Sequence, residues 1–382
     1  MTFRNGAVTF ERLTLWQKFF RFNWGLALLI LAVAAIGFLM LFSVAGGDVD
    51  PWASRQMTRF GVGFGIMVVV AMIDLRYWKL MSPLVYFGAI GLLIAVEFLG
   101  VTGMGAQRWI DLGFFRLQPS ELMKVALILA LARYYSWLPA DRTSTLVWLA
   151  PPLIMMAVPV LLVLRQPDLG TALLLMTGGL GVMFLAGVSW WFFIAGGLGA
   201  GGMIAGVMIS RGTEWQILKD YQYRRIEVFL DPSQDPLGSG YHITQSKIAL
   251  GSGGVSGRGF MEGTQSRLNF LPEKHTDFIF TTLAEEFGFV GGASLLILYG
   301  LIITICFLSM ASSKNRFGGL LTGGLTLTFF LFFAVNISMV LGLAPVVGVP
   351  LPLVSYGGSA MLVLLFAFGL IQSAHINRKA ER

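Results

Sequence analysis

The chain is poor in the residues that usually hold metals or form disulfides. Its 382 residues include one cysteine, Cys306, and three histidines, His242, His275 and His375. A single cysteine forms no intrachain disulfide and no cysteine-based metal site, and these histidines cannot form an HExxH zinc helix. Cysteine usage therefore leaves the redox compartment open, and side chains alone predict no metal site.

Charge is also scarce, whereas apolar residues are abundant. Only 12% of the residues are charged and 56% are hydrophobic, against roughly 25% charged in an ordinary soluble domain. The net charge of +7 does not indicate nucleic acid as a partner, because the Lys and Arg lie in short clusters between apolar runs. The composition predicts an integral membrane protein.

Apolar runs of the length that spans a bilayer, about 20 residues, follow one another along the chain. They begin near Trp24, Phe60, Pro83, Pro119, Leu146, Leu169, Trp190, Phe278, Gly318 and Leu353. The first run is longer than a signal-peptide core, and no A-x-A-like cleavage site follows it. We predict an all-α polytopic membrane protein of about ten transmembrane helices, with residues 1–382 as one domain.

Lys and Arg are distributed unevenly between the two sides that ten spans create. The side holding both termini has about thirteen, and the short loops opposite have about five. The positive-inside rule assigns the richer side to the cytoplasm and does not count long loops. We predict cytoplasmic ends at residues 1–22 and 377–382, and one long extracytoplasmic loop, residues 211–277, between the seventh and eighth helices.

The predicted long loop contains polar, aromatic and glycine-rich stretches. Its aromatic residues favour packing over disorder, and residues 223–230 and 243–250 could each form a short amphipathic helix along the membrane surface. Residues 251–259 could wrap an anion with backbone N–H groups, although they match no nucleotide-binding motif. Residues 197–202 match GxGxxG only formally, and inside an apolar run they indicate close helix packing.

Ionisable residues inside the predicted spans lie in the outer half of the membrane. Each costs about 2.5 to 3.5 kcal/mol at the bilayer centre, so each needs a partner or a function. They are Glu97, Lys124, Asp168, Glu285 and Glu286. The segments 118–121 and 166–168 both place a proline and a capping residue at a helix start. We predict that Lys124 and Asp168, which lie at similar depth, form an ion pair that is either structural or functional.

Two polar segments precede predicted spans. Arg108 and Trp109, with Arg116 nearby, could bind a phosphate next to a sugar or lipid chain, or they could be a snorkelling arginine and an aromatic belt residue. Asp277 stands where a polar segment enters the eighth helix, so the helix dipole favours its ionised form and desolvation its neutral form. Asp277 could act as a general base or merely cap that helix.

Four motifs occur in order along the chain: QPSE at 118–121, QPDLGT at 166–171, LPEKHTDF at 271–278 and PLVSYGGS at 352–359. Together they strongly resemble the SEDS family (shape, elongation, division and sporulation). Residues 241–247, 251–254 and 263–266 resemble its elongation branch more than its division branch.

The resemblance implies a peptidoglycan glycosyltransferase of the cytoplasmic (inner) membrane. Such enzymes polymerise lipid II, an undecaprenyl-pyrophosphate-linked disaccharide-pentapeptide, into glycan strands on the extracytoplasmic face during elongation and rod-shape maintenance. The implied partners are a class B penicillin-binding protein, which is the transpeptidase, and the elongation complex with MreC and MreD. By position, Asp277 matches the proposed catalytic aspartate, and Lys124 and Asp168 match the intramembrane charged pair.

These roles suggest a mechanism in which Asp277 accepts the proton of the acceptor's 4-hydroxyl as undecaprenyl pyrophosphate leaves the donor. Arg108, Arg116, Lys247 or a divalent cation, Mg²⁺ or Mn²⁺, could neutralise the pyrophosphate. No cofactor is evident in the sequence, and a cation held mainly by the pyrophosphate would leave almost no trace in it. Further residues expected to bind or support the substrate are Trp109, Lys124, Asp168, Glu273, His275 and Ser355.

Two other functions remain open at this point. A transporter or lipid flippase would also have many helices, buried charges and broken helix starts. Against it, the Gln-Pro helix starts run in one direction, and the ionisable residues cluster away from the midplane. A scaffold without catalytic activity would leave the carboxylate of Asp277 unexplained.

Overall fold

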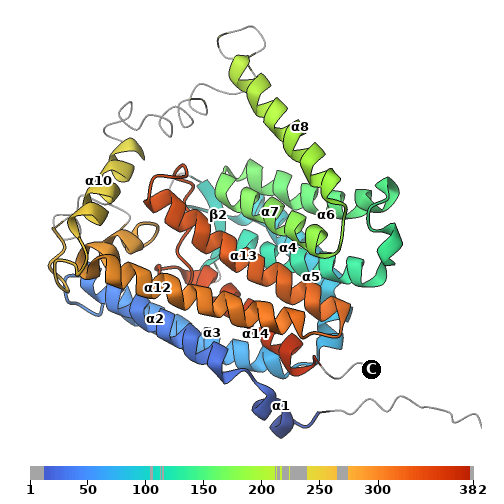
Figure 1. Cartoon of the computed structure of the whole chain (residues 1–382), viewed down its shortest axis with the longest axis horizontal. Coiled ribbons are helices and arrows are strands. Elements are labelled where there is room, and N and C mark those ends of the chain that lie inside the picture. The colour runs from blue at the N-terminus through green and yellow to red at the C-terminus, as the bar shows by residue number, and fades with distance from the viewer. Residues whose placement is uncertain are drawn as a thin grey trace, which may run out of the picture.

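Helices make up nearly all the regular structure of this computed structural model (Figure 1). It describes residues 13–378 except 104–105, 112, 114–115, 211, 213–215, 217–222, 224–238 and 265–273. The first helices are α1 (Leu15–Arg21), α2 (Trp24–Val44), α3 (Ala53–Met72) and α4 (Leu75–Leu99). They are followed by α5 (Pro119–Trp137), η1 (Ala140–Arg142), α6 (Leu146–Arg165), α7 (Leu169–Leu185) and α8 (Trp190–Ile209). The last are α10 (Ser239–Ser252), α12 (Ile279–Ala311), α13 (Arg316–Val340) and α14 (Gly358–Ile376).

Three short antiparallel strands join α4 to α5. They are β1 (Val101–Gly103), β2 (Ala106–Asp111) and β3 (Arg116–Leu117), in the order β1-β2-β3. This small sheet carries Arg108 and Trp109 on β2 and Arg116 on β3.

Each of the ten predicted apolar runs overlaps one long helix, from α2 to α8 and from α12 to α14. In the described part of the chain, seven helices are long and apolar enough to cross a membrane, namely α2, α4, α6, α8, α12, α13 and α14. The helix α7 is apolar but shorter. The predicted all-α membrane fold is confirmed, while the count of ten spans and the side of each terminus stay predictions.

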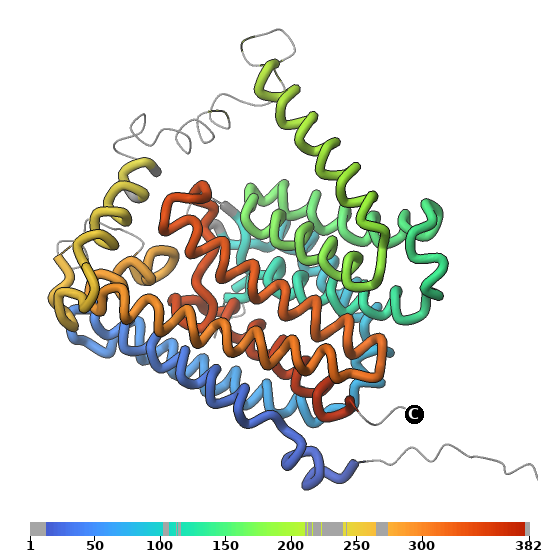
Figure 2. Tube along the Cα trace, in the orientation of Figure 1, coloured from blue at the N-terminus to red at the C-terminus, as the bar shows by residue number. Residues whose placement is uncertain are grey.

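The three C-terminal helices form the centre of the bundle (Figure 2). The helix α13 contacts α5, α7, α12 and α14, while α14 lies along α3 and α12 lies along α2. In Figure 2 these orange and red helices lie between the blue pair α2 and α3 and the cyan and green group α4 to α7. Residues from both halves of the chain therefore meet around α13 and α14.

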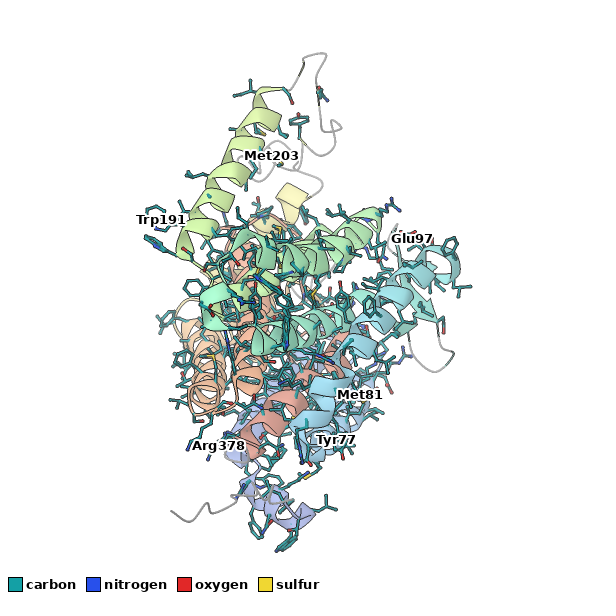
Figure 3. The ribbon with its side chains drawn as sticks, turned by 90° about the vertical axis from the view of Figure 1, so that its right-hand side faces the viewer. Tyr77, Met81, Glu97, Trp191, Met203 and Arg378 are labelled. Carbon is teal, nitrogen blue, oxygen red and sulfur yellow. The ribbon has the colours of Figure 1, made fainter. Side chains whose placement is uncertain are left out.

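The helix α8 leaves the bundle and points away from it (Figures 1 and 3). Figure 3 shows Trp191 and Met203 on this projecting helix, and none of its residues is buried. A Cβ added at Gly197 or Gly202 would meet nothing within 4 Å. The predicted close packing at residues 197–202 is wrong for this structure, because glycine permits a close approach only where a second helix is present.

The glycine-rich turn after α10 packs on α12 instead of wrapping an anion. The backbone N–H groups of Arg258 and Gly259 donate to the carbonyls of Glu285 and Glu286 at 3.1 and 3.0 Å. Backbone donors that already have protein partners are not open to a ligand. The expectation that residues 251–259 bind an anion is therefore wrong for these N–H groups.

Replacing Gly257 by Ala should destabilise the fold. Its φ is +82°, and an added Cβ would lie 2.1 Å from the carbonyl oxygen of Glu286. Overpacking of this kind typically costs about 1 to 3 kcal/mol, so the melting temperature in detergent should fall. The control is Gly251→Ala, where nothing lies within 4 Å of an added Cβ. Equal melting temperatures for the two variants would contradict a stabilising contact between this turn and α12.

Candidate functional site

Asp277 lies in a turn, residues 274–278, at the entrance to α12. The helix begins at Ile279 with Phe278 at the N-cap position, where no side chain caps it. Asp277 therefore precedes the N-cap residue by one position, and its side chain is half-buried. This is the boundary between polar loop and spanning helix that the sequence predicts.

A buried amide holds the backbone of Asp277 against the loop between α13 and α14. The Asn336 side chain on α13, with no exposed surface, donates to the carbonyl oxygens of Asp277 at 2.8 Å and Val349 at 2.7 Å. A Cβ added at Gly348 would lie 3.6 Å from Asp277 Oδ2. The carboxylate therefore faces this loop at a residue that has no side chain.

Hydrogen bonds from the loop just before α14 hold the two residues before Asp277. The Ser355 hydroxyl donates to the carbonyl of Thr276 at 2.6 Å, and the Tyr356 N–H donates to the carbonyl of His275 at 2.9 Å. On α3, the Gln56 amide donates to the carbonyl of Ser355 at 2.9 Å. Ser355, predicted to bind or support substrate, thus contacts the backbone beside Asp277 directly.

Aromatic rings surround the same turn. The imidazole of His275 stacks on Trp52 with ring centroids 4.7 Å apart and an interplanar angle of 15°. Tyr356 lies 6.1 Å from His275 on another side, and the Arg59 guanidinium lies over the Tyr356 ring at 4.8 Å. Burial lowers the pKa of the neighbouring Lys274 ammonium from its usual value. The turn therefore packs against aromatic rings on two sides, with the Arg59 guanidinium behind one of them.

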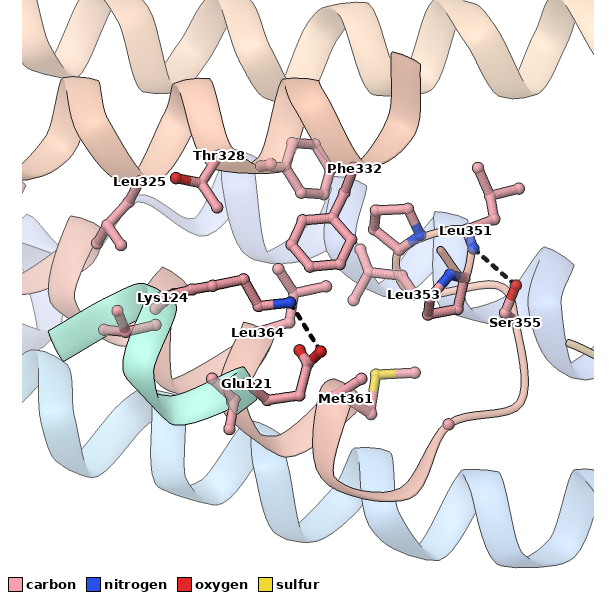
Figure 4. Close-up of a pocket in the computed structure, with 18 residues that line it drawn as sticks. Glu121, Lys124, Leu325, Thr328, Phe332, Leu351, Leu353, Ser355, Met361 and Leu364 are labelled. Atoms are coloured by element: carbon pink, nitrogen blue, oxygen red, sulfur yellow. Dashed lines mark hydrogen bonds and ion pairs between the residues drawn. The ribbon is translucent and has the colours of Figure 1, made fainter. Parts of the chain in front are cut away.

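Lys124 does not pair with Asp168, so that prediction is wrong. Its ammonium lies 2.7 Å from Glu121 Oε1, one helical turn away on α5, and 3.8 Å from the centroid of the Phe332 ring (Figure 4). Both charged side chains are buried, at 3% and 9% exposure. The i,i+3 spacing lets Lys124 reach a partner on its own helix, which makes a partner at a neighbouring helix end unnecessary.

The Glu121–Lys124 pair lines a narrow cavity of about 60 Å³ that reaches the loop holding Asp277. Leu351, Pro352 and Ser355 line it on the loop side (Figure 4). The volume exceeds the 10 to 15 Å³ that one water needs, so the cavity can hold water beside the two charges. The ion pair and the segment that carries Ser355 therefore share one small space.

Asp168 is the N-cap residue of α7 and has an arginine beside it. Its carboxylate accepts hydrogen bonds from the N–H and the hydroxyl of Thr171 at 3.2 and 2.9 Å. Arg108 Nη1 lies 3.9 Å from Asp168 Oδ2, and the same guanidinium donates to the carbonyls of Gln166 and Pro167 at 3.1 and 2.5 Å. Arg108 thus connects β2 to the start of α7.

The remaining predicted site residues lie around this centre. Lys247 is exposed on α10 and lies against Gly342, where an added Cβ would be 2.3 Å from its Cε. Arg116 is 3.5 Å from Asp111 and 66% exposed, and Trp109 is half-buried on β2. Glu273 and the predicted helix at 223–230 lie outside the described residues, apart from Tyr223. The predicted helix at 243–250 is part of α10, which packs on α12 and α13.

Asn336 and Gln56 hold the site, and neither is among the residues predicted from the sequence. Each has no exposed surface. Asn336 stands in an apolar run of α13, whereas Gln56 lies between Arg55 and Arg59 in the polar first turns of α3. A lone amide inside an apolar run needs hydrogen-bond partners, because burying it unpaired is costly. That signal could have identified Asn336 but not its partner Asp277, 59 positions away. Gln56 carries no such signal, and its partner Ser355 lies 299 positions away.

Comparison with known proteins places this architecture in a family. The family described as cell cycle protein, FtsW/RodA/SpoVE, matches residues 23–380. The chain is 44% identical to peptidoglycan glycosyltransferase MrdB of Escherichia coli K12, over 96% of both proteins. It is 35% identical to a probable peptidoglycan glycosyltransferase FtsW of Tolumonas auensis, over 94% of this chain and 93% of that one. The higher identity to MrdB agrees with the predicted elongation branch.

Solved structures show the same fold. A chain of a peptidoglycan synthase complex superposes with a TM-score of 0.80 at 32% identity, covering 94% of this chain and 99% of that chain. The rod shape determining protein RodA of Thermus thermophilus gives a TM-score of 0.70 at 29% identity, covering 94% and 98%. The chain therefore belongs to the FtsW/RodA/SpoVE family, which is the SEDS family that its four motifs resemble.

Proposed function

We propose that this chain is a peptidoglycan glycosyltransferase that polymerises lipid II during cell elongation. The observation that carries the proposal is Asp277, a half-buried carboxylate at the mouth of α12 whose backbone is held by Asn336 and, through Thr276, by Ser355. A reacting carboxylate needs such fixed geometry, since a misplacement of about 1 Å can cost roughly 10²-fold in rate. The names of the MrdB and FtsW relatives support the same activity.

In the proposed reaction, the acceptor's 4-hydroxyl oxygen attacks the anomeric carbon of the donor glycan. The new C–O bond forms as the bond from that carbon to undecaprenyl pyrophosphate breaks. Asp277 accepts the hydroxyl proton as general base, a contribution typically worth about 10² to 10⁴ in rate. A lipid-linked donor explains why the carboxylate stands at the start of a spanning helix.

The departing pyrophosphate needs positive charge nearby. Arg108 already donates to two carbonyls and lies beside Asp168, and Arg116 lies beside Asp111. Lys247 is the better candidate, because it is exposed and lies against the loop segment that also faces Asp277. In the described residues no group of three or more His, Cys, Asp or Glu could hold a metal. A Mg²⁺ or Mn²⁺ ion would therefore be bound mainly by the pyrophosphate.

The proposed setting is the cytoplasmic membrane, with both termini inside and Asp277 at the extracytoplasmic face. A class B penicillin-binding protein would crosslink the product, and MreC and MreD would complete the elongation complex. The likeness to a chain of a peptidoglycan synthase complex supports a partner enzyme of this kind.

The test is glycan-chain formation from purified lipid II by the full chain in detergent, with and without the partner and a divalent cation. Polymer products resolved by gel electrophoresis support the proposal. Lipid II movement across liposomes without any polymer would support the flippase instead. If the chain forms no polymer and moves no lipid II, the scaffold is supported.

Replacing Asn336 by Leu should slow polymerisation about 10- to 100-fold. The carbonyls of Asp277 and Val349 would lose their donor, and the turn could shift away from the substrate. The matched control is Thr326→Val on the same helix, whose hydroxyl donates to Thr322 and contacts Cys306 on α12, both of which lie outside the turn of Asp277. We expect the control to keep wild-type rates. An equal loss in both variants would mean that general packing of α13, rather than this amide, supports activity.

A further inference from the structure

A second, larger and more open cavity lies between α4, α5 and α6, at the end of the bundle opposite to Asp277. Its volume is about 730 Å³. It is lined by Lys79, Ser82, Pro83, Tyr86, Arg133 and Tyr134, with Phe87, Trp137 and Met155 at its edges. This end of α4 lies near α1 and the end of α14, because Lys18 pairs with Asp74 at 2.6 Å and Ser373 donates to the carbonyl of Ile73. Figure 3 shows Tyr77 and Met81 at this end of α4 and Glu97 at the other.

Three prolines within helices leave backbone carbonyls without their usual partners around this cavity. Proline has no N–H, so the carbonyl four residues earlier loses its helical hydrogen bond. Pro83 on α4 leaves the carbonyl of Lys79 free in this way. On α6, Pro152 does the same for Trp148, and Pro159 does the same for Met155.

A side chain that lines the cavity satisfies each of these three carbonyls. The carbonyl of Lys79 accepts from Arg133 Nη1 at 3.0 Å and also from the Ser82 hydroxyl of its own helix at 3.0 Å. The hydroxyl of Tyr134 donates to Trp148 at 2.8 Å, and that of Tyr86 donates to Met155 at 2.9 Å. The bonds from Arg133, Tyr134 and Tyr86 each join two different helices. These bonds connect α4, α5 and α6 around the cavity.

The cavity carries positive charge that the protein does not neutralise. Lys79 and Arg133 are its two charged lining residues, and neither is among the ion pairs found in the described residues. The hydrogen bonds of Arg133 go to neutral carbonyls, at Lys79 and at Leu80. The Lys79 ammonium lies 6.0 Å from the centroid of the Phe317 ring, a contact with a neutral group that leaves its charge available to an anion.

The edges of the cavity face the surrounding lipid. Phe87 is 68% exposed and Trp137 is 67% exposed, and both belong to helices of the membrane bundle. Basic pockets between spanning helices on the cytoplasmic side are suited to anionic lipid headgroups, and the predicted topology puts this end there. We propose that the cavity binds the phosphate of an anionic phospholipid, with Lys79 and Arg133 as its cationic contacts.

The test is lipid binding by the full chain in detergent, read by native mass spectrometry with phosphatidylglycerol and, separately, phosphatidylcholine. We expect wild type to retain phosphatidylglycerol preferentially. Lys79→Gln and Arg133→Gln should each weaken that binding about five-fold, as expected for one basic residue near a lipid phosphate. Equal retention of the two lipids by wild type would overturn the proposal.

Two controls keep the result specific. Arg142→Gln removes an exposed charge from η1 at the same end of the bundle and should leave phosphatidylglycerol binding unchanged. If Arg142→Gln weakens binding as much as Lys79→Gln does, the effect is a general one of surface charge, and the proposed site is overturned. Arg133→Lys keeps the charge if Arg133→Gln fails to fold, and should retain most of the binding. Complete displacement of phosphatidylglycerol by equimolar glycerol 3-phosphate would assign the cavity to a soluble phosphate and overturn the lipid assignment.

Discussion

Replacing Asp277 by Asn should reduce glycan-chain synthesis from purified lipid II to background. The amide cannot accept the proton of the acceptor hydroxyl, and general-base help of this kind is worth about 10² to 10⁴. Asp277→Glu should also lose about 10²-fold, because the longer side chain moves the carboxylate by about 1 Å against Gly348 and the turn. The measurement is the initial rate of polymer formation in detergent.

The controls for Asp277 separate chemistry from folding. Asp277→Asn should keep the wild-type melting temperature and co-purify with the partner, since Asn336 and Ser355 hold its neighbourhood through backbone carbonyls. Asp141→Asn removes an exposed carboxylate from η1 and should leave the rate unchanged. Near-wild-type polymer from Asp277→Asn would disprove the assignment of the base.

Replacing Lys124 by Met should strongly destabilise the protein. Glu121 would be left as a buried carboxylate at 9% exposure without its ammonium, and breaking a buried pair in this way costs about 3 to 5 kcal/mol. The double variant Glu121→Gln, Lys124→Met removes both charges and should recover most of the melting temperature in detergent. The pair contributes to folding mainly by mutual neutralisation.

Activity of the same double variant tests whether the pair also has a functional role. The cavity beside Glu121 and Lys124 reaches the segment of Ser355, which contacts the backbone next to Asp277. We therefore expect a folded double variant to polymerise lipid II at least 10-fold more slowly than wild type, by analogy with the 10²-fold cost of small displacements. Full recovery of the rate would show that the pair is structural only.

The position of Asp277 could be predicted from the sequence, whereas the partner of Lys124 could not. Asp277 could be identified because a polar segment leads directly into an apolar run, a pattern visible along the chain. The predicted pairing of Lys124 with Asp168 is wrong because similar depth places two side chains in the same layer of the membrane. Depth alone does not show which side chains in that layer are in contact. The partner is the closer Glu121 carboxylate, on the same helix face.

Asn336 and the turn at residues 251–259 illustrate the opposite limit. A buried amide in α13 needs partners, but only the packed structure brings the carbonyls of Asp277 and Val349 to it. The glycine-rich sequence of residues 251–259 is compatible with a ligand loop, whereas in the structure these residues fit against the backbone of α12. Glycine-rich sequence permits a close approach, and the partner in that approach is a tertiary matter.

The sequence by itself determined the membrane fold, the positions of the long helices and the carboxylate at the entrance to α12. Hydrophobic length and local charge control those features, and both can be read along the chain. The tertiary structure alone decided the partner of Lys124, the backbone contacts around Asp277 and the basic cavity between α4, α5 and α6. Those features depend on distances between segments far apart in sequence, which packing sets and local pattern does not encode.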